Sequence, residues 1–256
     1  MLIVVKELVY AVKTLFTTTR DRLILLGLVL IAAMISVSEL AVAKLFTDII
    51  GFEKSMDTTN LIILIIGFFL FFGITKAGHF LQRVYKVKFF DKAFKASSAE
   101  VHASKENWRW SLAFELTNIL STCTQLGAII LFFAYLSWPF AIVNILVVLA
   151  IFQVYGKLFS GQLDAQRGFI VAKKNKELIT NAVRIGSRIK SGEIGILISG
   201  IAMLILLAVL IYFSYIGGIS TANTIVLFFG LKMQNSSFSN ISTALMRFAR
   251  ARTNSE

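Results

Sequence analysis

Cysteine, proline and acidic residues are all scarce in this sequence. Cys123 is the single cysteine among 256 residues, which excludes an intrachain disulfide and a cysteine-based metal site. Proline interrupts helices, so the presence of only one proline, Pro139, favours long uninterrupted helices. Asp and Glu number 14 against 26 Lys and Arg, which gives a formal net charge of +12. We therefore expect an all-helical, cationic chain without cysteine chemistry.

Hydrophobic residues make up 57% of the chain, and Phe alone contributes 23 residues. A water-soluble domain of this length could not bury so much apolar surface in one core. The remainder must face lipid, which predicts an all-α integral membrane protein.

Six apolar stretches are long enough, or nearly so, to cross a membrane. A helix needs about 20 apolar residues to cross about 30 Å of hydrocarbon. The last stretch is the weakest, because it is strongly apolar only as far as Gly230. We predict a single domain over residues 1–256, with transmembrane helices at residues 23–43, 61–80, 112–136, 140–155, 194–215 and 221–240.

Lysine and arginine are concentrated on one side of these predicted helices. Most of the 26 lie in the two terminal segments, in the two long loops or immediately beside these loops. The exceptions are Lys44, Lys54 and Lys232. By the positive-inside rule, both termini and the loops at residues 82–110 and 156–192 are expected in the cytoplasm. Cations between apolar stretches contact anionic lipid headgroups, and this patterning gives no support for nucleic-acid binding.

The cytoplasmic segments themselves have helical patterns. Residues 1–16 carry polar side chains on one side and apolar ones on the other, which predicts a helix lying in the membrane interface. The two long loops repeat apolar residues at spacings of three and four among charges. We expect both loops to extend the flanking transmembrane helices into the cytoplasm.

This order of elements resembles the transmembrane domain of ABC exporters, the type 1 transmembrane region. In the second loop, ELITNAVRIGSRIK (177–190) is similar to the family's stretch leading to a coupling helix, and residues 221–251 are similar to its last helix. The resemblance implies a six-helix fold with an N-terminal elbow helix, in the plasma (bacterial inner) membrane. It also implies a homodimer or heterodimer of such subunits and a separate nucleotide-binding ATPase subunit, which would hold ATP and Mg²⁺.

The resemblance further implies two contact regions for that ATPase, at residues 92–107 and 179–190. The residues assigned to coupling are Glu177, Arg184, Ile185, Ile189 and Lys190.

The sequence contains no recognisable catalytic motif. No glycine begins a G-x-x-x-x-G-K-[ST] phosphate-binding loop. His79 and His102 have no partner at metal-ligand spacing, so no metal or other cofactor is expected on this chain. We predict that the chain is not an enzyme, and that ATP hydrolysis resides on a partner chain or on a further C-terminal portion.

Polar residues within the predicted helices are the candidates for a substrate path. A charge at membrane depth is costly and usually faces protein or water. Glu115 shares one helix face with four polar residues at spacings of three and four. The candidates are Glu39, Ser111, Glu115, Asn118, Thr122, Gln125, Lys232, Gln234, Asn235 and Ser239. Hydrogen bonding between helices, without substrate contact, is the alternative role.

Two charge pairs are predicted at membrane depth. Lys44 and Asp48 are four residues apart and can pair on one helix face. Glu39 has no partner on its own helix, and we expect it to pair with Lys232 across the bundle.

Three functions fit this pattern. The first is the membrane subunit of an ATP-driven exporter. The second is a proton-driven secondary transporter in which Glu39 or Glu115 carries the proton. The third is a membrane immunity or assembly protein that transports nothing.

Overall fold

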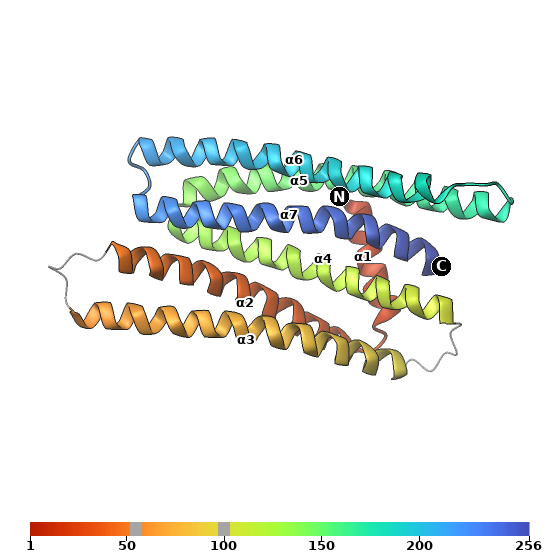
Figure 1. Ribbon diagram of the computed structural model, residues 1–256, viewed down its shortest axis with the longest axis horizontal. Coiled ribbons are helices and arrows are strands. Elements are labelled where there is room, and N and C mark those ends of the chain that lie inside the picture. The colour runs from red at the N-terminus through yellow and green to blue at the C-terminus, as the bar shows by residue number, and fades with distance from the viewer. Residues whose placement is uncertain (52–57, 97–102, 256) are drawn as a thin grey trace.

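The structure is a computed structural model that describes residues 1–51, 58–96 and 103–255. Within these ranges the chain is helical and contains no strand, which confirms the predicted all-α class. The helices are α1 (Leu2–Leu15), α2 (Thr19–Ile50), α3 (Thr58–Ala96), α4 (Ala103–Leu136), α5 (Trp138–Lys174), α6 (Asn181–Tyr215) and α7 (Thr221–Ser255). Helices α2 to α7 form one elongated bundle, and α1 runs across it near the end that holds the C-terminus (Figure 1). We call this the α1 end.

Five of the helices, α2 to α6, are long and apolar enough to cross a membrane. Their number and composition identify a multi-pass membrane protein. The predicted sixth crossing, residues 221–240, falls in α7, which is not one of the five. The physical reason is its position: α7 packs against α2, α4, α5 and α6. A helix surrounded by other helices exposes little surface to lipid, so few of its residues need to be apolar.

Local sequence signals set the helix ends. Thr18 and Thr180 are N-caps, and their hydroxyls accept hydrogen bonds from the backbone N–H groups of Asp21 and Val183. Helix α6 stops before Gly217, whose φ of +73° few side chains tolerate. The N–H of Gly218 then donates to the carbonyl of Phe213. These ends keep the turn between α6 and α7 short.

Helix α3 lies at the edge of the bundle. Among the described helices its one extensive neighbour is α2. Most side chains of its apolar stretch, such as Ile62, Ile66 and Phe69, are exposed. The edge position makes α3 a lipid-facing helix in a membrane, and its placement depends on its contact with α2.

The core has two parts. Near the α1 end, the ring of Phe16, which directly follows α1, packs with aromatic rings of α3 and α4, and the centroids of Phe90 and Phe114 are 5.1 Å apart. Toward the opposite end, Leu40, Phe133, Leu227 and neighbouring side chains form the second cluster. There the helices approach so closely that a Cβ on Gly230 would lie 2.3 Å from Phe133.

Candidate functional site

The predicted polar stripe on α4 is present, and it is mostly covered. Thr122 is buried, while Ser111, Glu115, Asn118 and Gln125 are half-buried. The Thr122 hydroxyl donates to the Asn118 carbonyl of its own helix at 2.8 Å. The stripe therefore faces the bundle rather than lipid, and part of its hydrogen-bonding capacity is used within α4.

Glu115 is the charged member of this stripe and has a partner that the sequence did not reveal. Its Oε1 lies 2.9 Å from Nε of Arg247 on α7, and its side chain is 16% exposed. Its second oxygen, Oε2, is buried without a hydrogen-bond partner among the described residues. Lys86 and Arg188 also interact electrostatically with this carboxylate. The Glu115 carboxyl group thus lies among three cations from three helices.

The α1 ends of α6 and α7 are rich in arginine. A cavity of about 180 Å³ lies between the two helices and is lined in part by Arg188, Glu193 and Arg247. Desolvation, and then the positive charges of Arg188 and Arg184, lower the pKa of Arg250. Its guanidinium lies over the ring of Trp108 at 5.2 Å. Like charges are therefore held close together here.

Gln234 on α7, a predicted path residue, is sealed in the core. Asn144 Nδ2 donates to Gln234 Oε1 at 2.9 Å, and Gln234 Nε2 donates to Asn144 Oδ1 at 3.2 Å. Both side chains are buried. In this conformation the pair joins α5 to α7 and lines no open path. The sequence signal for Asn144 was one amide within an otherwise apolar stretch.

The other predicted residues of α7 lie in different environments. Lys232 is exposed, and the Ser239 hydroxyl donates to the Asn235 carbonyl of the same helix at 3.1 Å. Asn235 is half-buried, and its Oδ1 has no hydrogen-bond partner among the described residues. Among the predicted α7 residues Lys232, Gln234, Asn235 and Ser239, only Asn235 has a buried polar atom without a hydrogen-bond partner within the described residues.

Further along α7, polar and small residues serve close helix packing. The Tyr155 hydroxyl donates to the carbonyls of Phe238 and Gly195, at 3.1 and 3.4 Å. Ser242 donates to the Gly192 carbonyl at 2.9 Å. Hydrogen bonding between helices therefore accounts for much of the polarity of this half of α7.

Glu39 has a different partner from the expected one. The prediction that it pairs with Lys232 is wrong: Glu39 Oε1 lies 3.1 Å from Nε2 of His79 on α3. Both side chains are between one third and two fifths exposed. The reason is the packing of α2 against α3, which the order of helices alone does not fix. The predicted pair Lys44–Asp48 is confirmed.

The Glu39–His79 pair belongs to a polar seam between α2 and α3. The Thr75 hydroxyl donates to Ser38 Oγ at 2.8 Å, and the Ser38 hydroxyl donates to the Phe71 carbonyl at 2.8 Å. The seam links the edge helix α3 to the bundle by specific hydrogen bonds in addition to apolar contact.

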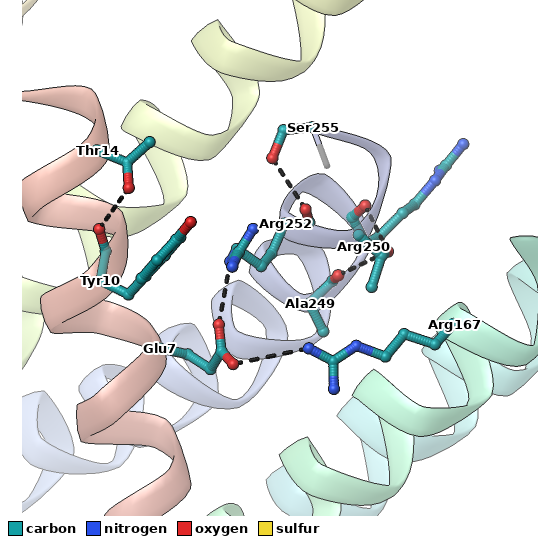
Figure 2. Close-up of polar contacts among 9 residues, drawn as sticks. Glu7, Tyr10, Thr14, Arg167, Ala249, Arg250, Arg252 and Ser255 are labelled. Carbon is teal, nitrogen blue, oxygen red and sulfur yellow. Dashed lines mark hydrogen bonds and ion pairs between the residues drawn. The ribbon is translucent and has the colours of Figure 1, made fainter.

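A second ionic centre joins α1 to the bundle, and sequence reasoning missed it. Figure 2 shows the Glu7 carboxylate between Arg252 of α7 and Arg167 of α5. The oxygen–nitrogen distances are 3.0 Å to Arg252 and 3.8 Å to Arg167. The Arg252 guanidinium also lies 4.4 Å from the centre of the Tyr10 ring. Glu7 thereby connects three helices.

The predicted coupling residues lie at the tip of the α5–α6 hairpin. Glu177 is exposed in the turn, and Arg184, Ile185, Ile189 and Lys190 lie on the first turns of α6. Of these four, Arg184 is half-buried and the others are exposed. Apolar side chains also project at this tip, and Leu178 is fully exposed. The first contact region, 92–107, and His102 fall partly or wholly outside the described residues.

Just inside this tip, α5 and α6 share a buried amide. Ser187 and Ser191 of α6 both donate to Gln162 Oε1, at 3.2 and 3.3 Å. The Nε2 atoms of Gln162 and Gln166 are buried and lack hydrogen-bond partners within the described residues. A buried donor without a partner costs free energy.

No protein-family model matches the chain, and no curated protein matches its sequence. Within the described residues no three His, Cys, Asp or Glu side chains gather as a metal site would require. What the structure brings together are ionic centres at the α1 end, a sealed amide pair in the core and a polar seam beside α3.

Proposed function

We propose that the chain is the membrane-spanning subunit of an ABC-type exporter, coupled to a separate ATPase chain through the α5–α6 hairpin. The supporting observation is the length of these two helices, 37 and 35 residues. At about 1.5 Å per residue each measures more than 50 Å, against about 30 Å of hydrocarbon. The hairpin would therefore extend well into the cytoplasm, where a soluble partner can reach it.

The surface of the hairpin tip supports a protein partner there. Leu178, Val171 and Val183 are exposed large apolar side chains, and cationic residues such as Lys190 lie close by on α6. Apolar side chains grouped in water are typical of an interaction site. The ATPase subunit is the proposed occupant, because a transport subunit without a phosphate-binding loop needs an external energy source.

The proposal takes α7 as a sixth crossing and α1 as an elbow helix in the cytoplasmic interface. Helix α7 packs against α2, α4, α5 and α6, which are four of the five helices that can each cross a membrane, so it would cross with them. Helix α1 lies across the bundle, with Leu2, Val5 and Val9 exposed. In a membrane interface these side chains would enter the acyl-chain region.

A dimer is part of the proposal because six helices alone would enclose little space. Gln234, proposed for the path, is closed off by Asn144 in the single chain. The path would form between two such subunits, identical or paralogous. ATP-driven movement of the hairpins would then switch it between inward- and outward-facing states.

Co-purification in mild detergent tests the proposal. We expect an ATP-binding chain to accompany the native protein, and Leu178→Asp to reduce its recovery at least tenfold. The matched control is Ile216→Asp, which places the same charge on an exposed apolar residue in the turn at the opposite end. Equal recovery from both variants, or no ATPase with the native protein, would contradict the proposal.

One observation favours a proton-driven transporter as the second candidate. Glu39 and His79 form a partly exposed acid–base pair on two apolar helices, an arrangement suited to carrying a proton. Under this alternative, Glu39→Gln abolishes transport, and transport stops when the proton gradient is dissipated while ATP remains. Under the ABC proposal, transport instead follows ATP and survives loss of the gradient.

A further inference from the structure

A cationic cavity lies between the start of α2 and the second half of α3, at the α1 end of the bundle. Its volume is about 440 Å³. Arg20 from α2 and Lys88 and Lys92 from α3 line it, together with Tyr85. The function proposed above makes no use of this cavity.

The charges of the cavity are unbalanced. Arg20, Lys88 and Lys92 have no carboxylate within ion-pair distance among the described residues. One acidic side chain, Asp21, also lines the cavity, and its carboxylate accepts a hydrogen bond from the Thr18 hydroxyl at 2.6 Å. Three positive charges and one negative charge leave a net charge of +2, which favours an anion.

The cavity also has an apolar side, formed by Ile24 and Phe89. The Phe89 ring stacks on Phe16, which directly follows α1, with centroids 5.5 Å apart. This contact puts the cavity at the level of α1, the amphipathic helix. Leu23 and Val84, sequence neighbours of the cavity residues Ile24 and Tyr85, are exposed apolar residues.

We infer that this cavity binds the phosphate headgroup of an anionic phospholipid. The cations and the Tyr85 hydroxyl would contact the phosphate, while the acyl chains would leave along Ile24 and the neighbouring apolar surface. A soluble phosphate would gain nothing from that apolar side, so the lipid is the occupant that uses the whole site. Cations near an anionic membrane surface each contribute favourably to such binding.

The bound lipid would support α3. This edge helix has α2 as its one extensive neighbour among the described helices, and the cavity spans the two. A phosphate bridging Arg20 of α2 and Lys88 of α3 would hold their ends together where three cations otherwise repel. The inference stands independently of the ABC assignment, because it requires no ATPase and no transport.

Lipid titration of the purified chain tests the inference. The probe is phosphatidylglycerol, added to the protein in neutral detergent and followed by native mass spectrometry, with phosphatidylcholine as the zwitterionic comparison. The test variant is Arg20→Gln/Lys88→Gln/Lys92→Gln. The control, Lys6→Gln/Lys13→Gln/Lys157→Gln, removes three exposed charges elsewhere in the structure.

We expect tighter binding of phosphatidylglycerol than of phosphatidylcholine to the native chain. If each cation contributes about fivefold to the affinity for phosphatidylglycerol, removing all three in the test variant lowers this affinity about a hundredfold. The control variant should change by less than about threefold, since its charges act only through the diffuse surface field. If the triple variant fails to fold, Lys88→Gln and Lys92→Gln alone should each show about fivefold weaker binding.

Three results would overturn the inference. Equal losses in the test and control variants would indicate diffuse attraction without a site. Equal affinity for both lipids would show that the net negative charge of the headgroup does not determine binding. Displacement of the lipid by millimolar inorganic phosphate would indicate a site for a soluble anion.

Discussion

Glu7 and Arg252 join the two ends of the chain: Oε2 of the carboxylate lies 3.0 Å from the guanidinium Nε, although 245 residues separate them. Both side chains are largely buried, at 16% and 11% exposure. Arg167 approaches the same carboxylate from α5 (Figure 2). The position of α1 across the bundle therefore depends on an ionic contact with helices from the other half of the chain.

Glu7→Gln should loosen α1. The substitution keeps the size of the side chain but leaves two arginines without their carboxylate, so we expect a loss of about 1–3 kcal/mol in the free energy of unfolding. Thermal unfolding in detergent measures the loss, and hydrogen exchange should increase in residues 2–15. Lys6→Gln, an exposed neighbour on α1, is the control and should have little effect.

A double-mutant cycle isolates this contact. Adding Arg252→Gln to Glu7→Gln should cost less than the sum of the two single changes, with a coupling of about 0.5–3 kcal/mol. Strict additivity would mean that the two side chains do not interact in solution.

The buried Asn144–Gln234 amide pair should contribute to the stability of the fold. Asn144→Leu leaves the Gln234 amide buried without its partner, and Gln234→Leu does the same to Asn144. Each should reduce stability by about 1–3 kcal/mol. The double Leu variant removes both amides and should recover a large part of that loss. Two losses that simply add would show that the amides do not depend on one another.

Close helix contact makes Gly195 intolerant of a side chain. A Cβ there would lie 2.1 Å from Ser242 Oγ and 3.2 Å from the Tyr155 ring. Gly195→Ala should therefore destabilise the fold by about 1–3 kcal/mol. Gly200→Ala is the matched control on the same helix, since no atom of another helix lies within 4 Å of its Cβ position. It should be neutral or stabilising by up to about 1 kcal/mol. Equal effects of the two would contradict the packing described for α6 and α7.

The sequence predicted the helices well because their signals are local. Apolar length and the scarcity of proline both act within the helix that they define. Five of the six predicted crossings fall in helices apolar enough to cross a membrane. The sixth has a weaker signal because α7 gains its burial from neighbouring helices, which a hydropathy pattern cannot register.

The contacts between helices could not be predicted in the same way. Nothing near Glu39 in the sequence distinguishes His79 from Lys232 as its partner, because the choice depends on how α2 packs against α3. Glu7 is a similar case, since Arg252 lies at the far end of the chain. A signal did exist for Asn144: a buried amide in an apolar stretch requires a partner, and polar α7 was the richest source.

The account depends on six crossings that leave the α1 end in the cytoplasm. Labelling of intact cells with a membrane-impermeant maleimide tests this most directly, with Cys123→Ala as the background and single cysteines replacing Leu178, Ser255 or Ile216. We predict that Ile216→Cys reacts in intact cells, whereas Leu178→Cys and Ser255→Cys react only after permeabilisation. Labelling of Leu178→Cys or Ser255→Cys from outside would contradict the topology, and the proposed ATPase contact would fail with it.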